Sequence, residues 1–244
     1  MDTKLECFLK NFSIALNEIY RFGKRKCRRM AGFLIRSQTI RSYLRTHQVH
    51  KLQIGAGTNI LDGWLNTNES SFSSKVIFLE ATRPFPFDNS TFDYIFSEHQ
   101  IEHLSYKEGL FMLHECSRVL KPGGKIRVAT PDLDALIGLR ASEKNELQKR
   151  YIKWIVDTYF PDVGIYKESF VINNAFQNWE HRFLYDRETL KDSMERAGFI
   201  NIAFYSVGQS DEEILRGIEH HGKAICNEEI NSFETMVLEG KRPG

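Results

Sequence analysis

The sequence has few cysteines, and none of them is paired in a C-x-x-C motif. The four are Cys7, Cys27, Cys116 and Cys226. This spacing excludes a zinc finger or a zinc ribbon, and scattered free thiols are typical of a protein in a reducing cytoplasm. The sequence also lacks any apolar run near the roughly 20 residues that cross a bilayer, and its N-terminus lacks the pattern of a signal peptide. We therefore expect a cytoplasmic globular protein.

Acidic residues are missing from one long stretch, between Ile19 and Leu61. Residues 1–61 hold 12 Lys and Arg against 3 Asp and Glu, a formal charge of +9, and the remainder of the chain carries −8. Before the basic stretch, apolar residues recur at steps of three and four, which predicts an amphipathic helix. These residues are Leu5, Phe8, Leu9, Phe12, Ala15, Leu16 and Ile19. We predict that residues 1–48 form a basic helical extension.

This extension allows three interpretations. A cationic run beside an apolar helix face could bind an anionic membrane surface. Basic runs also bind nucleic acid, although we expect no nucleic-acid partner for this chain. A solvated linker, or a helix docked on the acidic remainder of the chain, is the simplest interpretation. Peripheral membrane contact through residues 1–48 stays open beside it.

Strand-like and helix-like patterns alternate over residues 49–244. Seven strands are expected at 51–54, 64–67, 76–79, 92–96, 125–130, 199–207 and 233–238. Apolar residues at helical spacing end at Leu120, and Asp186 can cap a later helix that Gly198 ends. Strands that alternate with helices predict an α/β fold with a mostly parallel sheet, covered on both faces.

Three segments are less regular. Only six residues separate Gly57 from Trp64, too few for a crossover helix, so either a turn replaces the helix or the second strand is misplaced. Ser210-x-x-Glu213 predicts a capping box that opens a short helix. Residues 134–185 are rich in aromatic side chains and predict an insertion over the carboxyl ends of the strands, where it would cover the substrate.

Polar residues and glycines follow the predicted strands, at the edge where open α/β sheets bind their ligands. Gly55-Ala56-Gly57 follows the first strand, and glycines let the backbone turn sharply beside a ligand. Ile60 occupies the sixth position of a dinucleotide fingerprint, which counts against NAD or FAD. Asn68 and Glu80 follow the next two strands, where their side chains can bind ribose hydroxyls or an adenine amine.

Two Glu-His pairs follow the fourth strand, Glu98-His99 and Glu102-His103. A histidine can act as a base near neutral pH, and a nearby glutamate can orient it. His99, Glu102 and His103 could instead hold a divalent metal. In a purely structural interpretation, Glu102 forms an ion pair with the following helix and His103 packs.

Together these motifs resemble the class I S-adenosylmethionine-dependent methyltransferases, in their type-11 group. The resemblance rests on residues 52–57, 86–93, 101–104 and 118–124. Residues 181–186 and 197–199 are also similar to a group of predicted bacterial methyltransferases of unassigned substrate. The resemblance implies a Rossmann-like, doubly wound sheet of seven mostly parallel strands with a late antiparallel strand, and assigns residues 49–244 to the methyltransferase domain.

The resemblance also implies that S-adenosylmethionine is the cofactor. Gly55 and Gly57 would carry its methionine and ribose, and Glu80 matches the acidic residue near the adenine. The complete predicted cofactor set is Gly55, Ala56, Gly57, Asn68, Glu80, Ala81, Glu98 and His99. Gln53 and Asn68 depart from the family, which usually has acids there, and an amide loses the strength of a charge-assisted hydrogen bond.

The implied activity is methyl transfer by in-line displacement to a small-molecule or glycan acceptor. We expect His99 to act as the base or to orient the substrate, with His181 as the second candidate. Related enzymes bind a metal through Glu-x-x-Glu-His, but His99 holds the first position here, so no metal is predicted. The alternative is a non-catalytic S-adenosylmethionine-binding or scaffold protein, peripheral to a membrane through its basic N-terminus.

Overall fold

The computed structural model describes residues 36–70 and 75–244. The predicted amphipathic helix over residues 5–19 and most of the basic run lie outside the described residues. Within the described ranges, no helix combines the length and the hydropathy of a membrane span.

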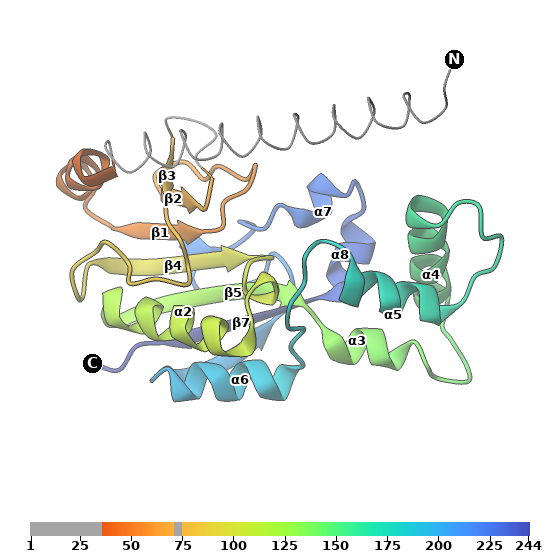
Figure 1. Ribbon diagram of the computed structural model, residues 1–244. Helices are drawn as coiled ribbons and strands as arrows, with labels where there is room; N and C mark the ends of the chain where they lie inside the picture. Colours follow the sequence, from red (N-terminus) through yellow and green to blue (C-terminus); the bar gives the residue numbers. More distant parts are fainter. Residues whose placement is uncertain (1–35, 71–74) are drawn as a thin grey trace, which may run out of the picture.

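A seven-stranded sheet forms the centre of the molecule, in the order β3-β2-β1-β4-β5-β7-β6 (Figure 1). The strands are β1 (Lys51–Ile54), β2 (Leu65–Asn68), β3 (Val76–Phe78), β4 (Phe92–Glu98), β5 (Leu120–Pro131), β6 (Ile200–Tyr205) and β7 (Thr235–Lys241). The first five run parallel, and β7 lies antiparallel between β5 and β6. The predicted doubly wound, mostly parallel sheet with a late antiparallel strand is therefore confirmed.

The described part of the chain has seven helices after β4, and five of them form two groups. They are α2 (Tyr106–Val119), α3 (Leu133–Gly138), α4 (Glu146–Tyr159), α5 (Glu168–Gln177), α6 (Arg187–Arg196), α7 (His221–Ala224) and α8 (Glu228–Glu234), with 3-10 turns η1 (Ile101–His103) and η2 (Glu213–Leu215). α2 and α6 pack against each other and against the sheet, whereas α3, α4 and α5 gather beyond the carboxyl end of β5 (Figure 1). We call α3, α4 and α5 the helical lobe.

Local sequence signals explain where most helices begin. The side chain of Ser105 accepts a hydrogen bond from Glu108 N, and the Glu108 carboxylate accepts one from Ser105 N, so α2 opens with a capping box. Asp186 caps α6 as predicted. The predicted Ser210 box does not form, because its hydroxyl accepts from Glu212 N two residues on (3.0 Å) and η2 has no side-chain cap.

Two connections differ from simple expectations. β1 and β2 are joined by a turn without a helix, so the first of the two alternatives for this connection holds. Residues 121–124, which follow the helical pattern that ends at Leu120, form the irregular start of β5. Leu120 already pairs with Phe92, and regular pairing with β4 resumes at Lys125. Gly123 permits this irregularity because it adopts a left-handed conformation, with φ +81°.

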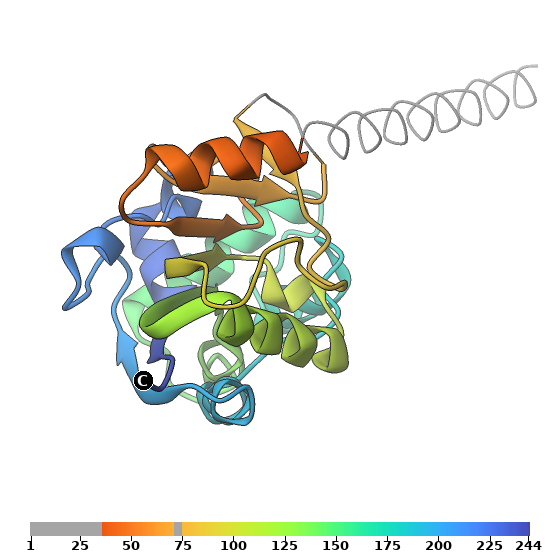
Figure 2. The ribbon, with the colours of Figure 1, turned by 90° about the vertical axis from the view of Figure 1, so that its left-hand side faces the viewer.

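A helix over residues 36–46 packs onto the β1–β2 side of the sheet (Figure 2). Ile40 and Tyr43 belong to the main core. The Tyr43 hydroxyl accepts from Lys51 N (2.8 Å) and lies within 3.1 Å of the carbonyls of Lys51 and Gly63. The last turns of the segment assigned to the extension therefore pack as part of the sheet domain.

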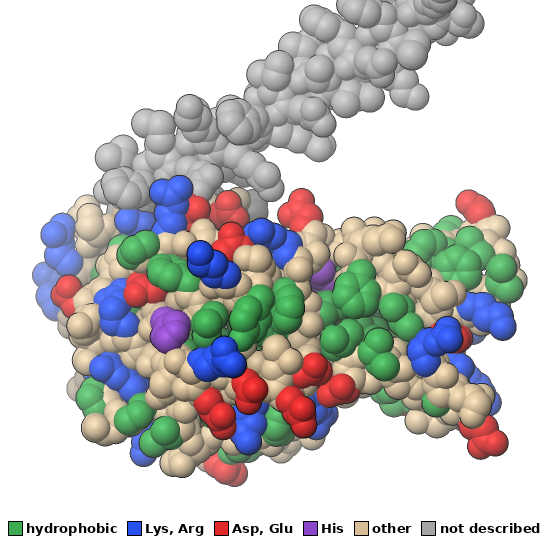
Figure 3. Space-filling model, turned by 60° about the horizontal axis from the view of Figure 1, so that its bottom comes forward, with side chains coloured by type: hydrophobic (Ala, Val, Ile, Leu, Met, Phe, Trp, Pro, Cys, Tyr) green, Lys and Arg blue, Asp and Glu red, His purple; other side chains and the backbone are tan. Residues whose placement is uncertain are grey.

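The helical lobe has a core of its own. Its buried members, with one from α8, are Leu136, Leu139, Tyr151, Ile152, Ile155, Val156, Val171, Ala175, Leu184 and Ile230. Apolar side chains also reach the surface on this side of the molecule (Figure 3), among them Ile137 and Phe176, each about half exposed. The lobe is thus a separately packed unit beside the carboxyl ends of the strands.

A buried ion cluster ties the end of the chain to the sheet centre. The side chain of Arg127 on β5 is fully buried. It donates to Glu219 and to Glu239 of β7, each at 2.6 Å. Because a buried cation needs charged partners, β5 depends on residues far along the chain.

Candidate functional site

The turn after β1 has the backbone that a ligand-binding glycine turn needs. Gly55 and Gly57 are left-handed, with φ of +73° and +50°. The amide of Ala56 between them donates to Thr67 O (2.8 Å), which holds the turn against β2. A side chain at Gly55 would collide with Gln100, whereas one at Gly57 would meet no atom within 4 Å.

A cavity of about 260 Å³ lies beside Gly55, and we call it the glycine-turn cavity. It is lined by Ile54, Gly55, Glu69, Leu79, Glu80, Ala81, Thr82, Gln100, His103, Leu104, Glu108 and Arg182. Of the predicted cofactor residues, the structure brings Gly55, Glu80 and Ala81 together here. The others, namely Ala56, Gly57, Asn68, Glu98 and His99, are not among its lining residues.

Two acidic side chains reach the glycine-turn cavity from neighbouring strand ends. Glu80 is held from its own turn, since its Oε1 accepts from Arg83 Nε at 3.0 Å and Thr82 Oγ1 at 3.3 Å. Asn68 caps the end of β2, where its Oδ1 accepts from Glu69 N (2.9 Å). Glu69 lines the cavity in its place. Sequence reasoning missed Glu69, although an acid directly after Asn68 was the available signal.

The carboxylate of Glu98 points to a distant part of the backbone. It accepts from the amides of His220 and His221, both at 2.9 Å, and lies 3.5 Å from Asn59 Nδ2. These bonds fix the segment before α7 to the end of β4. The geometry therefore gives Glu98 an anchoring role, and its place in the predicted cofactor set remains a prediction.

His99 turns away from the glycine-turn cavity. Its φ is +45°, which few residues other than glycine adopt. Its ring stacks on that of His221 at 3.8 Å between centroids. Nδ1 lies 3.0 Å from Glu102 Oε1, and Nε2 lies 3.3 Å from Thr235 Oγ1. His99 was predicted both to bind the cofactor and to act on the substrate. Its ring lines a second cavity rather than the one beside Gly55.

The His99–Glu102 contact shifts both pKa values. Burial alone lowers the pKa of His99, but the adjacent carboxylate of Glu102 and two further acids outweigh burial and raise it. Burial raises the pKa of Glu102, but the contact with His99 and the nearby histidines outweigh it and lower that pKa. The pair is therefore stabilised in its charged form.

The second cavity measures about 340 Å³, and we call it the aromatic cavity. It is lined by His99, Glu102, His103, Pro131, Leu136, Tyr151, Trp154, Tyr159, Ala175, Trp179, His181, His221, Ile225 and Glu234. His103 lines both cavities, so the two adjoin at this side chain. The rings come mainly from the helical lobe, which places that lobe over the carboxyl ends of the strands.

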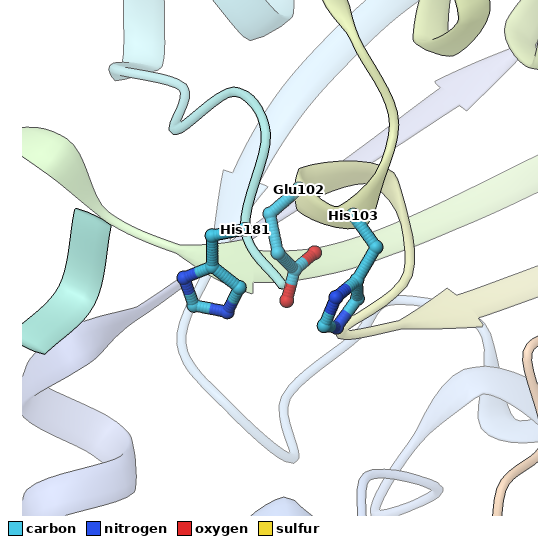
Figure 4. Close-up of side chains that lie close together, drawn as sticks. All are labelled: Glu102, His103 and His181. Carbon is cyan, nitrogen blue, oxygen red and sulfur yellow. The ribbon is translucent and has the colours of Figure 1, made fainter. Parts of the chain in front are cut away.

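His181 lies beside Glu102 and His103, as Figure 4 shows. The amides of Arg182 and Phe183 both donate to Glu102 O, at 2.8 and 3.2 Å, which ties this segment to η1. The rings of His103 and His181 are 5.1 Å apart. Burial lowers the pKa of His181 and so favours its neutral form. The two predicted catalytic residues, His99 and His181, therefore share the aromatic cavity.

Comparisons with known proteins find a family whose model is similar to part of the chain. The family described as "Methyltransferase domain" matches residues 52–128, and none of the curated proteins matches the sequence. The chain is similar to the structure of a SAM-dependent methyltransferase from Archaeoglobus fulgidus, with 16% identity, a TM-score of 0.48, and coverage of 91% of this chain and 99% of that one.

A SAM-dependent methyltransferase from Thermotoga maritima is similar at 16% identity and a TM-score of 0.46, covering 92% of this chain and 96% of that one. Phosphoethanolamine N-methyltransferase 2 from Haemonchus contortus is similar at 14% identity and a TM-score of 0.43, covering 80% and 49%. The methyltransferase-domain match runs from β1 into β5, in a sheet that has the expected strand order.

Proposed function

We propose that the protein transfers a methyl group from S-adenosylmethionine to a small-molecule or glycan acceptor bound in the aromatic cavity. One observation carries the proposal: the glycine-turn cavity and the aromatic cavity adjoin at His103. A donor in the first cavity and an acceptor in the second would meet beside the His103 side chain, where the acceptor atom could reach the methyl carbon directly. Such alignment of two reactants supplies much of the rate of a transfer reaction.

The glycine-turn cavity suits the cofactor. Gly55 lines the cavity with its backbone packed closely against Gln100, and Glu69 and Glu80 line it at neighbouring strand ends. Carboxylates accept strong hydrogen bonds from hydroxyl and amine donors such as those of a nucleoside. When bound, S-adenosylmethionine would supply a methyl group on a positively charged sulfur. An acceptor atom in line with the bond between carbon and sulfur would take the methyl group, and the sulfur would leave with the bonding electrons.

The aromatic cavity suits an acceptor with a flat or ring-shaped body. Trp154, Tyr159 and Trp179 meet edge to face, with centroid distances of 6.1 and 5.1 Å. Rings in this arrangement bury much apolar area and exclude water. His99 is held by Glu102 and stacked on His221, so we assign to it the orienting of the acceptor.

The test measures cofactor binding and methyl transfer separately. The full chain is titrated with S-adenosylmethionine by calorimetry and then incubated with methyl-labelled cofactor and cell extract, fractionated into small molecules and glycans. We expect binding, and label in one of these two fractions. Absence of binding contradicts the proposal, and binding without transfer to any fraction favours the non-catalytic alternative.

A variant pair checks the assignment of the acceptor cavity. Trp154→Ala removes a ring of the aromatic cavity, and Phe176→Ala removes an exposed ring outside it. We expect Trp154→Ala to lose most of the transfer activity while binding cofactor as the wild type does. Equal activity of the two variants would place the acceptor elsewhere.

A further inference from the structure

We propose that Glu102, His103 and His181 form a binding site for a divalent transition-metal ion, with zinc as the preferred ion. One ligand atom of each residue lies within 4.8 Å of the other two. In Figure 4 the carboxylate lies between the two imidazole rings. Two imidazoles and one carboxylate are a ligand set that binds zinc and other transition metals.

Groups around the three side chains hold them as the neighbours of metal ligands usually do. Nδ1 of His181 lies 2.7 Å from the carbonyl of Ala175, which leaves Nε2 as the free nitrogen. Thr130 Oγ1, fully buried, donates to Glu102 Oε2 at 2.9 Å. Metal-binding histidines and carboxylates are regularly oriented by such second hydrogen bonds.

Two observations indicate unused ligand capacity. Oε1 of Glu102 is buried and receives no hydrogen bond of regular geometry, although His99 Nδ1 lies 3.0 Å away. Among the residues that the structure describes, none makes a hydrogen bond to the ring of the half-buried His103, which lies 5.1 Å from the ring of His181. A metal ion would give the ring of His103 a partner and would add one to the Glu102 carboxylate, which His99 and Thr130 already hold in place.

The ligand atoms of the three residues lie farther apart than zinc ligands do, so the three side chains would have to move closer together to bind the ion. Zinc binds these ligand types at about 2.0–2.2 Å, so tetrahedral ligands lie about 3.4 Å apart and the three side chains must draw together by roughly an ångström. The backbone before His181 is unusual, since Trp179 and Glu180 both have positive φ, +60° and +61°. Strained backbone of this kind gathers at binding sites, where it holds a side chain in place.

Three protein ligands leave a position free for a further donor atom. Because His103 borders both cavities, that position lies at their junction. This step rests on the proposed function: the metal would hold an oxygen or nitrogen atom of the acceptor next to the methyl donor. The metal site would then select acceptors that carry a metal-binding hydroxyl or amine.

The test titrates the metal-free full chain with zinc, manganese and magnesium chloride, without cofactor or acceptor. We expect one equivalent of zinc to bind, weaker binding of manganese, and no saturable binding of magnesium, which prefers oxygen ligands. His181→Ala should lower the zinc affinity about 100-fold or more, and Thr130→Val about tenfold. The exposed His114 gives a matched control, since His114→Ala should bind zinc as the wild type does.

Other outcomes decide against the site. No zinc binding, equal binding of magnesium, or unchanged zinc affinity in His181→Ala would each overturn the proposal. Circular dichroism establishes that each variant folds, and Thr130→Val serves if His181→Ala does not. Because these titrations contain neither cofactor nor acceptor, failure of the metal site leaves the methyltransferase proposal standing, and the reverse also holds.

Discussion

Gly55→Ala tests the close packing of the glycine turn. A left-handed conformation costs an L-residue roughly 1–2 kcal/mol, and the loss of unfolded-state entropy offsets about 0.4–1 kcal/mol of this. Gly164→Ala is the matched control, because Gly164 has a similar φ of +66° but no atom within 4 Å of a new side chain. At Gly55 the new methyl group also collides with Gln100.

Overpacking of this kind typically costs about 1–3 kcal/mol. We therefore expect Gly55→Ala to lower the free energy of unfolding by about that much more than Gly164→Ala, measured by urea denaturation. Adding Gln100→Ala should recover part of the difference, because it removes Oε1 and Cδ of Gln100 but keeps the Cβ, which lies 2.9 Å from the new methyl group. Equal destabilisation by the two glycine variants would refute the argument, and so would a double variant that recovers nothing.

The same variants report on the cofactor. Relief of the collision moves Gln100 within the glycine-turn cavity, so Gly55→Ala should raise the Kd for S-adenosylmethionine about tenfold or more, equivalent to 1.4 kcal/mol or above. Gly164→Ala should leave this Kd unchanged. Calorimetric titration measures both, and an unaltered Kd in Gly55→Ala would remove the glycine turn from the cofactor site.

Two predictions concern stability. Arg127→Met leaves Glu219 and Glu239 buried without their cation and should lower the free energy of unfolding by about 3–5 kcal/mol, measured by urea denaturation at pH 7. Burial already raises the pKa of Glu219, so this loss of stability should shrink as the pH falls and the carboxyl group takes up a proton. A loss that stays constant with pH would contradict this account. Hydrogen bonding to Arg118 lowers the pKa of Glu115 in the folded protein. The stability that the Glu115 carboxylate adds is therefore fully present above the unfolded-state pKa of 4.5 and is lost as the pH falls through the lower pKa of the folded state. Glu115→Gln should flatten this acid limb of the stability profile, and an unchanged limb would count against it.

Strands such as β1, β3 and β4 were predictable because each has several apolar residues in a short run. The same logic placed Gly55 and Glu80 at one edge of the sheet, and both line the glycine-turn cavity. Parallel strands bring their carboxyl ends together, so residues just after them are neighbours whatever the details of the side chains. The positions of the strands along the chain were therefore enough to predict that Gly55 and Glu80 lie at one cavity.

The positions of the other site residues depend on contacts between segments far apart in the sequence. His181 reaches Glu102 because Arg182 donates to the backbone of η1, a bond that no local pattern encodes. His99 turns away from Gly55 through a single left-handed residue, which is uncommon for histidine. Glu98 is occupied by amides more than 120 residues away. Each of these outcomes depends on how distant segments pack.

The ion cluster at the sheet centre also bears on how the chain folds during synthesis. Arg127 leaves the ribosome 112 residues before its partner Glu239. Until that last strand emerges, the middle of the sheet holds a cation without its full complement of counter-charges, an arrangement that a dry interior does not tolerate. We therefore expect β5 to stay hydrated in the nascent protein until Glu239 has emerged.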